Sequence, residues 1–452
     1  MNLIEQYENE GVKRVKLAFT DIDGVHRGKY VSLSKFASIL DGGAGFCDCV
    51  LGWDIDDQLY DNARFTGWHT AFPDARYKVD PGTERRIPDE GGTPCFLLDF
   101  IGEDGGSHAI CPRSLLKRVL EKANGMGFSV TLAFEYEFFV FNETPDSIRE
   151  KNYQKLNSLT PGNFGYSVLR NSAESNLFHE FMDYCVAMGF PLEGLHCETG
   201  PGVWEAAISC TDALAMADSA ALFKTFSKVF FQKRELLATF MAKWSMDYPG
   251  QSGHLHQSLT DRETERNLFY EQTGPNKMSE LMTQYLAGQQ KYLKPFLSMS
   301  APTINSYTRL VKGFWAPTTA TWGIDNRTCA LRVIPGSEKS QRLEFRVGSA
   351  DGNPYLVAAA NIASGLLGIE KGLSPTDPVE GNAYEIEDSL PDSLQLSSNL
   401  RDAVRDFEAC PEAADCFGAE FVEHYACSRN WEVREYERHV DDWQLKRYFE
   451  LI

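Results

Sequence analysis

One strand of this sequence carries two carboxylates on the same face, and such a face is costly to bury. Residues 131–141 read TLAFEYEFFVF. Side chains alternate across a strand, so the aromatic and aliphatic residues share one face while Glu135 and Glu137 share the other. Two neighbouring carboxylates in an otherwise apolar strand are unfavourable unless a cation neutralises them or water covers them. Taken alone, the strand fits either a cation site or a solvated outer face.

Three further segments repeat this arrangement of ionisable residues on one strand face. They contain Glu198 and Glu205 on either side of a Gly-Pro-Gly turn, His254 and His256 in GHLHQ, and Arg342, Glu344 and Arg346 in QRLEFRV. A hairpin at the Gly-Pro-Gly turn would bring its two glutamates together. Each segment alone has an ordinary explanation, such as a surface hairpin, core histidines with partners or an ion-paired surface strand. The four segments together favour a functional site.

The residue types in these segments indicate the chemistry. Glutamates with an occasional histidine suit Mg²⁺ or Mn²⁺ better than a metal that prefers thiolates. Arginine side chains can bind a phosphate or carboxylate group through two parallel hydrogen bonds. Metal carboxylates with an arginine cluster are what phosphoryl transfer requires, because that reaction needs charge neutralisation and in-line positioning. The sequence contains no GxxxxGK[ST] motif, which argues against a P-loop nucleotide site.

Length and periodicity predict two domains. The chain has 452 residues, more than one hydrophobic core usually organises. Strands are predicted at residues 12–19, 29–32 and 96–100, and residues 112–127 are predicted to form a helix with Pro near its start and Gly at its end. We therefore place the domain boundary near residue 105. Beyond it, strands alternate with helices such as residues 211–237, and the segment from residue 400 onward is predicted to be helical, polar and on the surface.

Composition limits the partners and the compartment. The formal net charge is −20, and a polyanion is repelled by phosphate backbones, so no nucleic-acid partner is expected. The 11 cysteines are odd in number and scattered, and Cys47-Asp48-Cys49 is too tight for a zinc knuckle, so free thiols in a reducing compartment are predicted. The N-terminal residues lack a signal-peptide apolar stretch, and no run of about 18 apolar residues exists. We expect a cytoplasmic protein with no membrane association.

At these residues the chain resembles the glutamine synthetase superfamily, with motifs in the family order across nearly the whole chain. The resemblance implies an α+β fold, with an N-terminal β-grasp domain (residues 1–104) and a larger catalytic domain (residues 105–452) of curved antiparallel strands and helices. It implies ATP as co-substrate, two or more Mg²⁺ or Mn²⁺ ions per active site, glutamate as acyl donor and a small amine as acceptor. It also implies a homo-oligomer built from hexameric rings, singly or as a dodecamer, with active sites between neighbouring subunits.

The resemblance further assigns roles to individual residues. The implied metal ligands are Glu137, Glu198 and Glu205 on the side of glutamate and amine, and Glu135, His254 and Glu344 on the nucleotide side. The implied ATP contacts are His256, Ser258, Arg342 and Arg332. The implied glutamate contacts are Arg309 in NSYTR, Arg346 and Gly250. Arg327 and Arg332, in DNRTCALR, are implied to neutralise the phosphoryl group in transfer, and Asn353-Pro354-Tyr355-Leu356 matches the family's NPYL signature.

Two departures distinguish this chain from ammonia-using members of the superfamily. Their flap reads GYEAP, and its Glu takes a proton from ammonium; here residues 313–317 read GFWAP, with Trp315 at that position. Their second ammonium ligand is the Asp of FDGSS; here Cys47 matches it, and the neighbouring Asp48 is the candidate replacement. Both changes remove negative charge, and a Trp can pack on an alkyl or aryl group or on a cation. The chain is therefore similar to the γ-glutamylamine branch, which includes glutamate–putrescine ligase and the γ-glutamylamide synthetases.

A third departure lies before His254. Residues 250–253 read GQSG, where many family members read GSGM close to the glutamate backbone. Arg309 and Arg346 still favour glutamate as the acyl donor.

Three hypotheses follow. The leading one is an ATP-dependent ligase that forms a γ-glutamyl amide from glutamate and a polyamine or alkylamine through γ-glutamyl phosphate. The second is glutamine synthetase itself, with Asp48 or a water replacing the missing proton acceptor. The third is a catalytically silent structural relative, which is disfavoured because a structural protein has no reason to bury so much unpaired charge.

Overall fold

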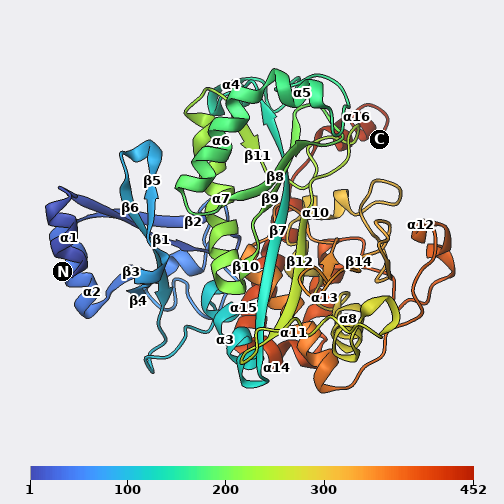
Figure 1. Cartoon of the computed structure of the whole chain (residues 1–452). Coiled ribbons are helices and arrows are strands. Elements are labelled where there is room, and N and C mark those ends of the chain that lie inside the picture. The colour runs from blue at the N-terminus through green and yellow to red at the C-terminus, as the bar shows by residue number, and fades with distance from the viewer. Residues whose placement is uncertain (1) are drawn as a thin grey trace.

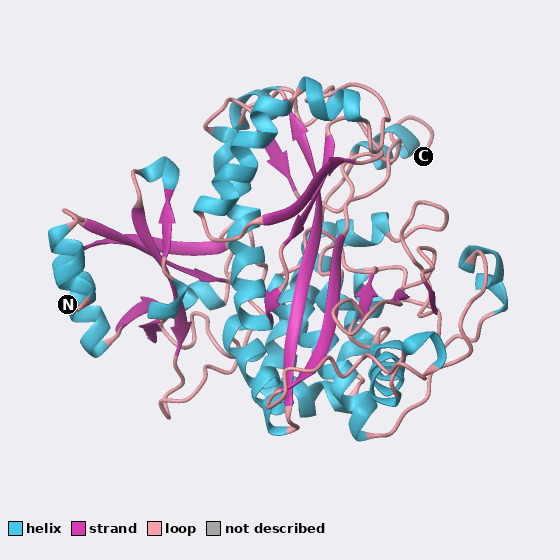
Figure 2. Ribbon diagram, in the orientation of Figure 1, coloured by secondary structure: helices cyan, strands magenta, loops and turns pink. Residues whose placement is uncertain are grey.

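Two β-sheets organise the chain, one within residues 14–100 and the other within residues 128–345 (Figure 1). The computed structural model describes residues 2–452. Helices surround the larger sheet, whereas the smaller sheet forms a separate lobe near the N-terminus (Figure 2). None of the helices within the described residues is both long and apolar enough to cross a lipid bilayer.

The smaller sheet has the strand order β2-β1-β6-β4-β3, with β5 added beside β6. Its strands are β1 (Arg14–Thr20), β2 (His26–Ser32), β3 (Ala44–Cys47), β4 (Asp74–Val79), β5 (Arg85–Ile87) and β6 (Thr93–Phe100). β1 pairs in parallel with β6, and the other pairs are antiparallel. Helices α1 (Leu3–Asn9) and α2 (Leu33–Gly42) accompany it, and the short 3₁₀ helix η1 (Asp48–Leu51) follows β3. Buried aromatic side chains fill the core of this lobe, because alternate residues of β1 and β6 point to the same side.

The larger sheet has the order β13-β14-β15-β12-β7-β9-β8, and β10 and β11 also pair with β7. Its strands are β7 (Phe128–Phe141), β8 (Leu192–Cys197), β9 (Val203–Ile208), β10 (Thr211–Asp212), β11 (Leu237–Thr239), β12 (Gly253–Asp261), β13 (Trp322–Ile324), β14 (Leu331–Ile334) and β15 (Arg342–Phe345). All its pairs are antiparallel except β13 with β14.

The helices of the larger part lie around this sheet and extend to the C-terminus (Figure 2). They are α3 (Pro112–Gly125), α4 (Pro145–Glu150), α5 (Val168–Ala173), α6 (Ser175–Ala187), α7 (Ala213–Gln232), α8 (Glu280–Tyr292), α9 (Leu297–Ser300), α10 (Ile304–Arg309), α11 (Pro354–Glu370), α12 (Ala383–Ile386), α13 (Leu400–Glu408), α14 (Pro411–Phe417), α15 (Ala419–Glu437) and α16 (Asp442–Tyr448).

The apolar face of β7 determines which face of the sheet stays open. Phe134, Tyr136 and Phe138 are buried, and Tyr136 stacks on Phe223 of α7 with ring centroids 6.1 Å apart. Burying such rings removes large apolar areas from water, which makes this side the core. The alternation predicted for residues 131–141 is therefore confirmed. It leaves the glutamates of β7 on the side of the sheet that the core helices do not cover.

Several other expectations from the sequence are confirmed. β1, β2 and β6 lie at the predicted strands, α3 and α7 at the predicted helices, and β8 and β9 form the predicted hairpin. The α+β architecture, with a small N-terminal sheet and a larger curved sheet that is mainly antiparallel, is as expected (Figure 1). All 11 cysteines are free thiols. The domain boundary near residue 105, which falls between β6 and α3, stays a prediction.

The prediction that the C-terminal helices are polar and lie on the surface is wrong for α15. Phe421 and Tyr425 of α15 are fully buried, and Arg429 is 2% exposed. The charge of Arg429 is compatible with burial because its guanidinium pairs with Asp23 and donates to the Pro302 carbonyl at 2.9 Å. The helix thus contacts both the N-terminal lobe and the larger part, and its charged composition did not predict this burial.

Candidate active site

A cavity of about 600 Å³ opens on the face of the larger sheet that carries the ionisable residues. It is lined by all six residues expected to bind metal, namely Glu135, Glu137, Glu198, Glu205, His254 and Glu344. It is also lined by Arg309, Arg327, Arg332, Arg342, Arg346, His256, Gly250 and Trp315. Ser258 and Asp48 are not among its lining residues. Five segments far apart in the sequence therefore meet at one site.

Strand register assembles the first carboxylate–histidine cluster. His254 of β12 lies opposite Glu135 of β7, and His256 lies opposite Glu344 of β15. The His254 Nδ1 atom is 3.5 Å from Glu344 Oε1 and 3.8 Å from Glu135 Oε2. One ligand atom from each of Glu135, His254 and Glu344 lies within 4.8 Å of the others. The Nε2 atom of His254 is buried and has no hydrogen-bond partner within residues 2–452.

A second cluster forms at the β8–β9 hairpin. Its compact group consists of His196, Glu198 and Glu205, whose ligand atoms lie within 4.8 Å of one another. The His196 Nε2 atom is 3.1 Å from Glu198 and 3.9 Å from Glu205. Glu137 lies opposite Glu205 on β7, but its carboxylate accepts a hydrogen bond from the Ser252 N–H. Sequence reasoning missed His196, although its spacing of two from Glu198 at the end of a strand could have indicated it.

The two clusters differ in how their carboxylates are neutralised. Burial opposes ionisation of Glu344, but Arg346, the two histidines and Arg332 outweigh it and lower its pKa to about 2. Burial raises the pKa of Glu205, and the neighbouring Glu137, Glu135 and Glu198 raise it further, to about 9. Glu205 thus lies among like charges without a cation, which is the arrangement that a bound divalent ion relieves.

The donor set fits Mg²⁺ or Mn²⁺, because it combines carboxylate oxygens with imidazole and contains no thiolate. The Nδ1 atom of His254 faces the carboxylates of Glu135 and Glu344, as expected for a metal ligand shared with them. Both clusters lie on one wall of the same cavity.

Arginines line the same cavity beside these carboxylates. Arg332 donates to Glu344 at 2.7 Å, and Arg346 donates to the same carboxylate. Arg309 is buried, and within the described part of the chain its guanidinium donates only to the carbonyl oxygens of Val347 (2.8 Å) and Arg346 (3.2 Å). Burial lowers the pKa of Arg309 to about 10, so it stays charged at neutral pH. A buried guanidinium without a carboxylate partner is suited to an anionic ligand.

Two aromatic residues on the cavity wall adopt left-handed backbone conformations. Trp315 has φ +60° and is 60% exposed, and Tyr166 has φ +57° and is 69% exposed. Bulky residues rarely adopt positive φ, and such strain is concentrated at functional sites. Tyr166 stacks on His196 with ring centroids 4.6 Å apart. Sequence reasoning identified Trp315 from the flap motif but missed Tyr166, which lies in an irregular segment between α4 and α5.

The remaining two expected site residues lie elsewhere in the single chain. Asp48 is buried at the start of η1 in the N-terminal lobe, where burial raises the pKa of its carboxyl. Ser258 lies on β12 opposite Thr131 of β7. Their proposed roles, like those of the other site residues, stay predictions.

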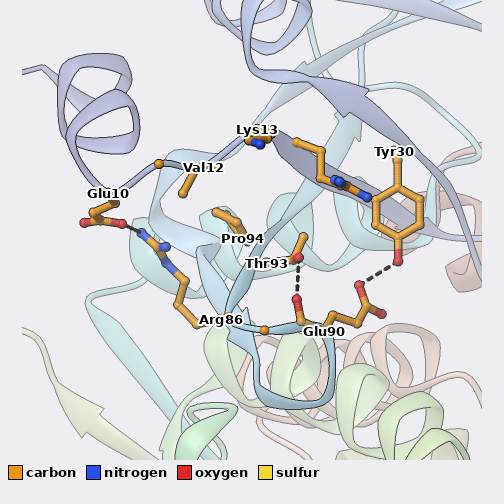
Figure 3. Close-up of a pocket in the computed structure, with 12 residues that line it drawn as sticks. Glu10, Val12, Lys13, Tyr30, Arg86, Glu90, Thr93 and Pro94 are labelled. Atoms are coloured by element: carbon orange, nitrogen blue, oxygen red, sulfur yellow. Dashed lines mark hydrogen bonds and ion pairs between the residues drawn. The ribbon is translucent and has the colours of Figure 1, made fainter.

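A larger hollow, of about 930 Å³, opens on the N-terminal lobe (Figure 3). Three of its charged side chains have partners within the hollow. Arg86 pairs with Glu10 at 2.8 Å, and Glu90 accepts from the Tyr30 hydroxyl at 2.6 Å. The smaller cavity on the large sheet gathers the glutamates, histidines and arginines expected from the sequence, and we therefore consider it the site of chemistry.

Comparison with known proteins finds relatives across nearly the whole chain. The family described as "Glutamine synthetase, catalytic domain" matches residues 109–448. "Type-1 glutamine synthetase 2" of Dictyostelium discoideum is 45% identical over 444 residues, which cover 97% of this chain and 84% of that protein. "Glutamate--isopropylamine ligase" of Pseudomonas sp is 36% identical over 447 residues, which cover 98% and 96%. A solved structure titled "Apo GmaS without ligand" superimposes with a TM-score of 0.86 at 28% identity, covering 99% of both chains.

These matches span nearly the whole chain and include the segments that carry the cavity residues. The chain therefore belongs to the glutamine synthetase family of ATP-dependent carboxylate–amine ligases and is similar to its γ-glutamylamine branch.

Proposed function

We propose that this protein joins the γ-carboxyl group of glutamate to a polyamine or alkylamine at the expense of ATP. The observation that carries the proposal is Trp315, which places an aromatic face on the cavity that holds the carboxylate clusters and the arginines. An alkylammonium ion is attracted to an aromatic face and gains from burying its methylenes, whereas ammonium has no methylenes to bury.

The reaction proceeds in two steps. An oxygen of the glutamate γ-carboxylate attacks the γ-phosphorus of ATP, and ADP leaves, which gives γ-glutamyl phosphate. The amine nitrogen then attacks the acyl carbon, phosphate leaves, and the nitrogen loses a proton. Both steps develop negative charge on phosphoryl oxygens, which fixed positive charges stabilise. Arg327 and Arg332 are proposed to supply this charge, and Arg309 and Arg346 to hold the glutamate.

Glu135, His254 and Glu344 are proposed to hold one divalent cation on the nucleotide side, together with the ATP contacts His256, Ser258 and Arg342. Glu137, Glu198 and Glu205, with His196 beside them, are proposed to hold another on the side of glutamate and amine. When bound, Mg²⁺ or Mn²⁺ supplies charge neutralisation for the phosphates and the γ-carboxylate.

The acceptor end of the cavity supports an amine larger than ammonia. Trp315 and Tyr166 present exposed aromatic surface, and Glu198 provides negative charge on the same cavity. A relative with 36% identity is named for isopropylamine, an alkylamine of this kind.

Glutamine synthesis from ammonia is the second candidate. A relative named "Type-1 glutamine synthetase 2" is 45% identical, a higher identity than that of the isopropylamine ligase. In that case, a carboxylate elsewhere would have to accept the proton from ammonium, because Trp315 occupies the flap position. Asp48 is the residue proposed for this role.

We also propose a homo-oligomer of hexameric rings. Asp48 does not line the cavity of its own chain, so its proposed role requires a neighbouring subunit. Apolar residues at the C-terminus, including Trp443, Phe449 and Leu451, are more than half exposed, which is typical of surface that another subunit covers.

Phosphate release from ATP tests the proposal. The protein is assayed with glutamate and a panel of amines (putrescine, isopropylamine, ethanolamine and an aromatic amine) against ammonium, and mass spectrometry identifies the product. We expect one or more amines to exceed ammonium in kcat/KM. Efficient use of ammonium alone would instead make glutamine synthetase the function, and no glutamate-dependent phosphate release with any acceptor would exclude both.

A further inference from the structure

A hydroxyl without an assigned role lies on the wall of the active-site cavity. Ser252 directly precedes β12 and lines the cavity together with Glu137 and Gly250. Its residual exposure is 3%, and its Oγ atom forms no hydrogen bond with any other described residue of the chain. Buried hydroxyls without a partner are unfavourable and uncommon. Such a group on a substrate cavity indicates that its partner is a ligand.

The backbone of Ser252 has its hydrogen bonds elsewhere. Its N–H donates to the Glu137 carboxylate, and its carbonyl accepts from the Glu137 N–H at 3.0 Å. Ser252 also forms an antiparallel bridge with Ser349. The side-chain hydroxyl is therefore the one remaining hydrogen-bonding group of this residue, and it is attached to a backbone that two neighbours hold in place. Rotation about χ1 can turn the Oγ atom toward the cavity without moving that backbone.

The surroundings of Ser252 favour an anionic partner. Gly250, two residues earlier, packs against Arg309 so closely that a Cβ at Gly250 would lie 2.6 Å from the Arg309 Cγ atom. Arg309 has carbonyl partners but no ion pair within residues 2–452, and Arg346 lines the same cavity. A hydroxyl that donates to a carboxylate makes a stronger bond than one between neutral groups.

Position 252 is also one of the places where this sequence departs from the family pattern. Residues 250–253 read GQSG where many members read GSGM, so the pattern has a residue without a side chain at this position. Ser252 therefore adds a donor that the common motif does not contain.

We propose that the Ser252 hydroxyl donates a hydrogen bond to a carboxylate oxygen of the acyl donor and helps to select glutamate. This inference rests on the proposed function only in taking glutamate as the acyl donor. It holds whether the acceptor is a polyamine, an alkylamine or ammonia.

The test compares Ser252→Ala with a matched control, Ser298→Ala. Ser298 on α9 is also buried, and its Oγ atom also lacks a partner in the described chain, but it does not line the cavity. Steady-state rates are measured over a range of glutamate at saturating ATP, with the best acceptor of the wild-type protein. Ser252→Ala should raise the glutamate KM roughly tenfold, with much smaller changes in the KM of ATP and in the Mg²⁺ concentration for half-maximal activity. Ser298→Ala should leave the glutamate KM unchanged.

Two results would overturn the proposal. One is a wild-type glutamate KM in Ser252→Ala. The other is a defect confined to the Mg²⁺ requirement, which would show that Ser252 acts by positioning Glu137 instead of contacting the substrate. Ser252→Gly, which restores the residue of the common motif, is the second variant, and thermal unfolding of both variants checks that they fold. If the wild-type protein is active and both variants keep its glutamate KM, the Ser252 contact alone is rejected. If the wild-type protein shows no glutamate-dependent activity, the proposed function is rejected, and the Ser252 contact with it.

Discussion

Glu137 on β7 lies directly opposite Glu205 on β9 in the antiparallel pairing of these strands. Directly opposed residues on one face have neighbouring side chains, so like charges repel there. Burial together with Glu137 raises the pKa of Glu205 to about 9. The chain alone therefore keeps Glu205 largely protonated at neutral pH, and a divalent cation would favour its ionised form.

Replacing Glu205 should separate metal binding from folding. Mg²⁺ or Mn²⁺ should raise the Tm of the wild-type protein, because a ligand that binds only the folded state stabilises it. Glu205→Gln removes a charged ligand but relieves the repulsion from Glu137. We expect this variant to lose most of the metal-dependent rise in Tm and nearly all ligase activity, without a lower Tm in EDTA. Calorimetry with metal and in EDTA measures the two Tm values, and phosphate release from ATP measures the ligase activity.

Glu193→Gln is the control for this experiment, since Glu193 is an exposed residue of the same hairpin. Its metal-dependent rise in Tm should equal that of the wild type. A full metal response in Glu205→Gln would remove Glu205 from the set of metal ligands.

Arg309→Ala should affect glutamate more than ATP. Loss of a charged hydrogen-bond partner typically costs about 1.5–3 kcal/mol, which corresponds to roughly tenfold or more in the glutamate KM. Arg342→Ala provides the reciprocal control, because Arg342 donates to His256 at 3.2 Å on the proposed nucleotide side and should instead raise the KM of ATP. Steady-state kinetics with each substrate varied in turn measure the pattern. An unchanged glutamate KM in Arg309→Ala would show that this guanidinium serves only the fold.

Much of the site could be predicted because strands impose strict alternation. Once residues 131–141 are a strand, Glu135 and Glu137 must share a face, and the Gly-Pro-Gly turn brings Glu198 and Glu205 together by local geometry. Which strands become neighbours is a long-range property that alternation does not determine. The order β15-β12-β7-β9, which unites the clusters, was not predicted from the sequence.

The features that were missed depend on irregular backbone or on tertiary packing. Tyr166 reaches the cavity from a segment between helices, in a left-handed conformation that no periodicity indicates. The burial of α15 depends on the pairing of Arg429 with Asp23, residues more than four hundred positions apart. The role of Ser252 depends on both its backbone groups being used by Glu137. Such information lies in the three-dimensional arrangement of distant segments.

Buried histidines should make the protein sensitive to acid. Burial lowers the pKa of His26, His108 and His424 to about 4 in the folded state. Their unfolded pKa is about 6.5, so between about pH 6.5 and 4 the unfolded chain binds more protons than the folded one. The free energy of unfolding should therefore fall as the pH is lowered through this window, by about 1–2 kcal/mol per fully buried histidine between pH 7 and 5.

His424→Gln tests this assignment. His424 is 3% exposed, and its Nε2 atom lies 2.7 Å from the Leu51 carbonyl. Urea unfolding at pH 7 and pH 5 should show a smaller difference between the two pH values in the variant than in the wild type. The exposed His439 provides the control variant His439→Gln, which should behave as the wild type does. Equal pH dependence in wild type and His424→Gln would mean that His424 is not the group that titrates.

The choice of acceptor should depend on Trp315. Its side chain is 60% exposed on the cavity wall, so an acceptor can cover it. Each buried methylene contributes about 0.8 kcal/mol, and about 1.4 kcal/mol corresponds to tenfold in rate. Two or three buried methylenes should thus favour an alkylamine over ammonium by roughly 10- to 100-fold in kcat/KM.

Trp315→Glu should reverse this preference in part. The substitution removes the apolar wall and adds a carboxylate that attracts ammonium and accepts its proton, so kcat/KM should fall for the alkylamine and rise for ammonium. The reversal should be incomplete, because Cys47 also replaces an acidic residue of the ammonia-using pattern. Trp315→Phe is the matched variant: it keeps an aromatic face without adding charge and should keep the preference for the alkylamine. If the wild-type protein used ammonium as efficiently as every amine tested, Trp315 would not determine specificity and glutamine synthesis would be the better assignment.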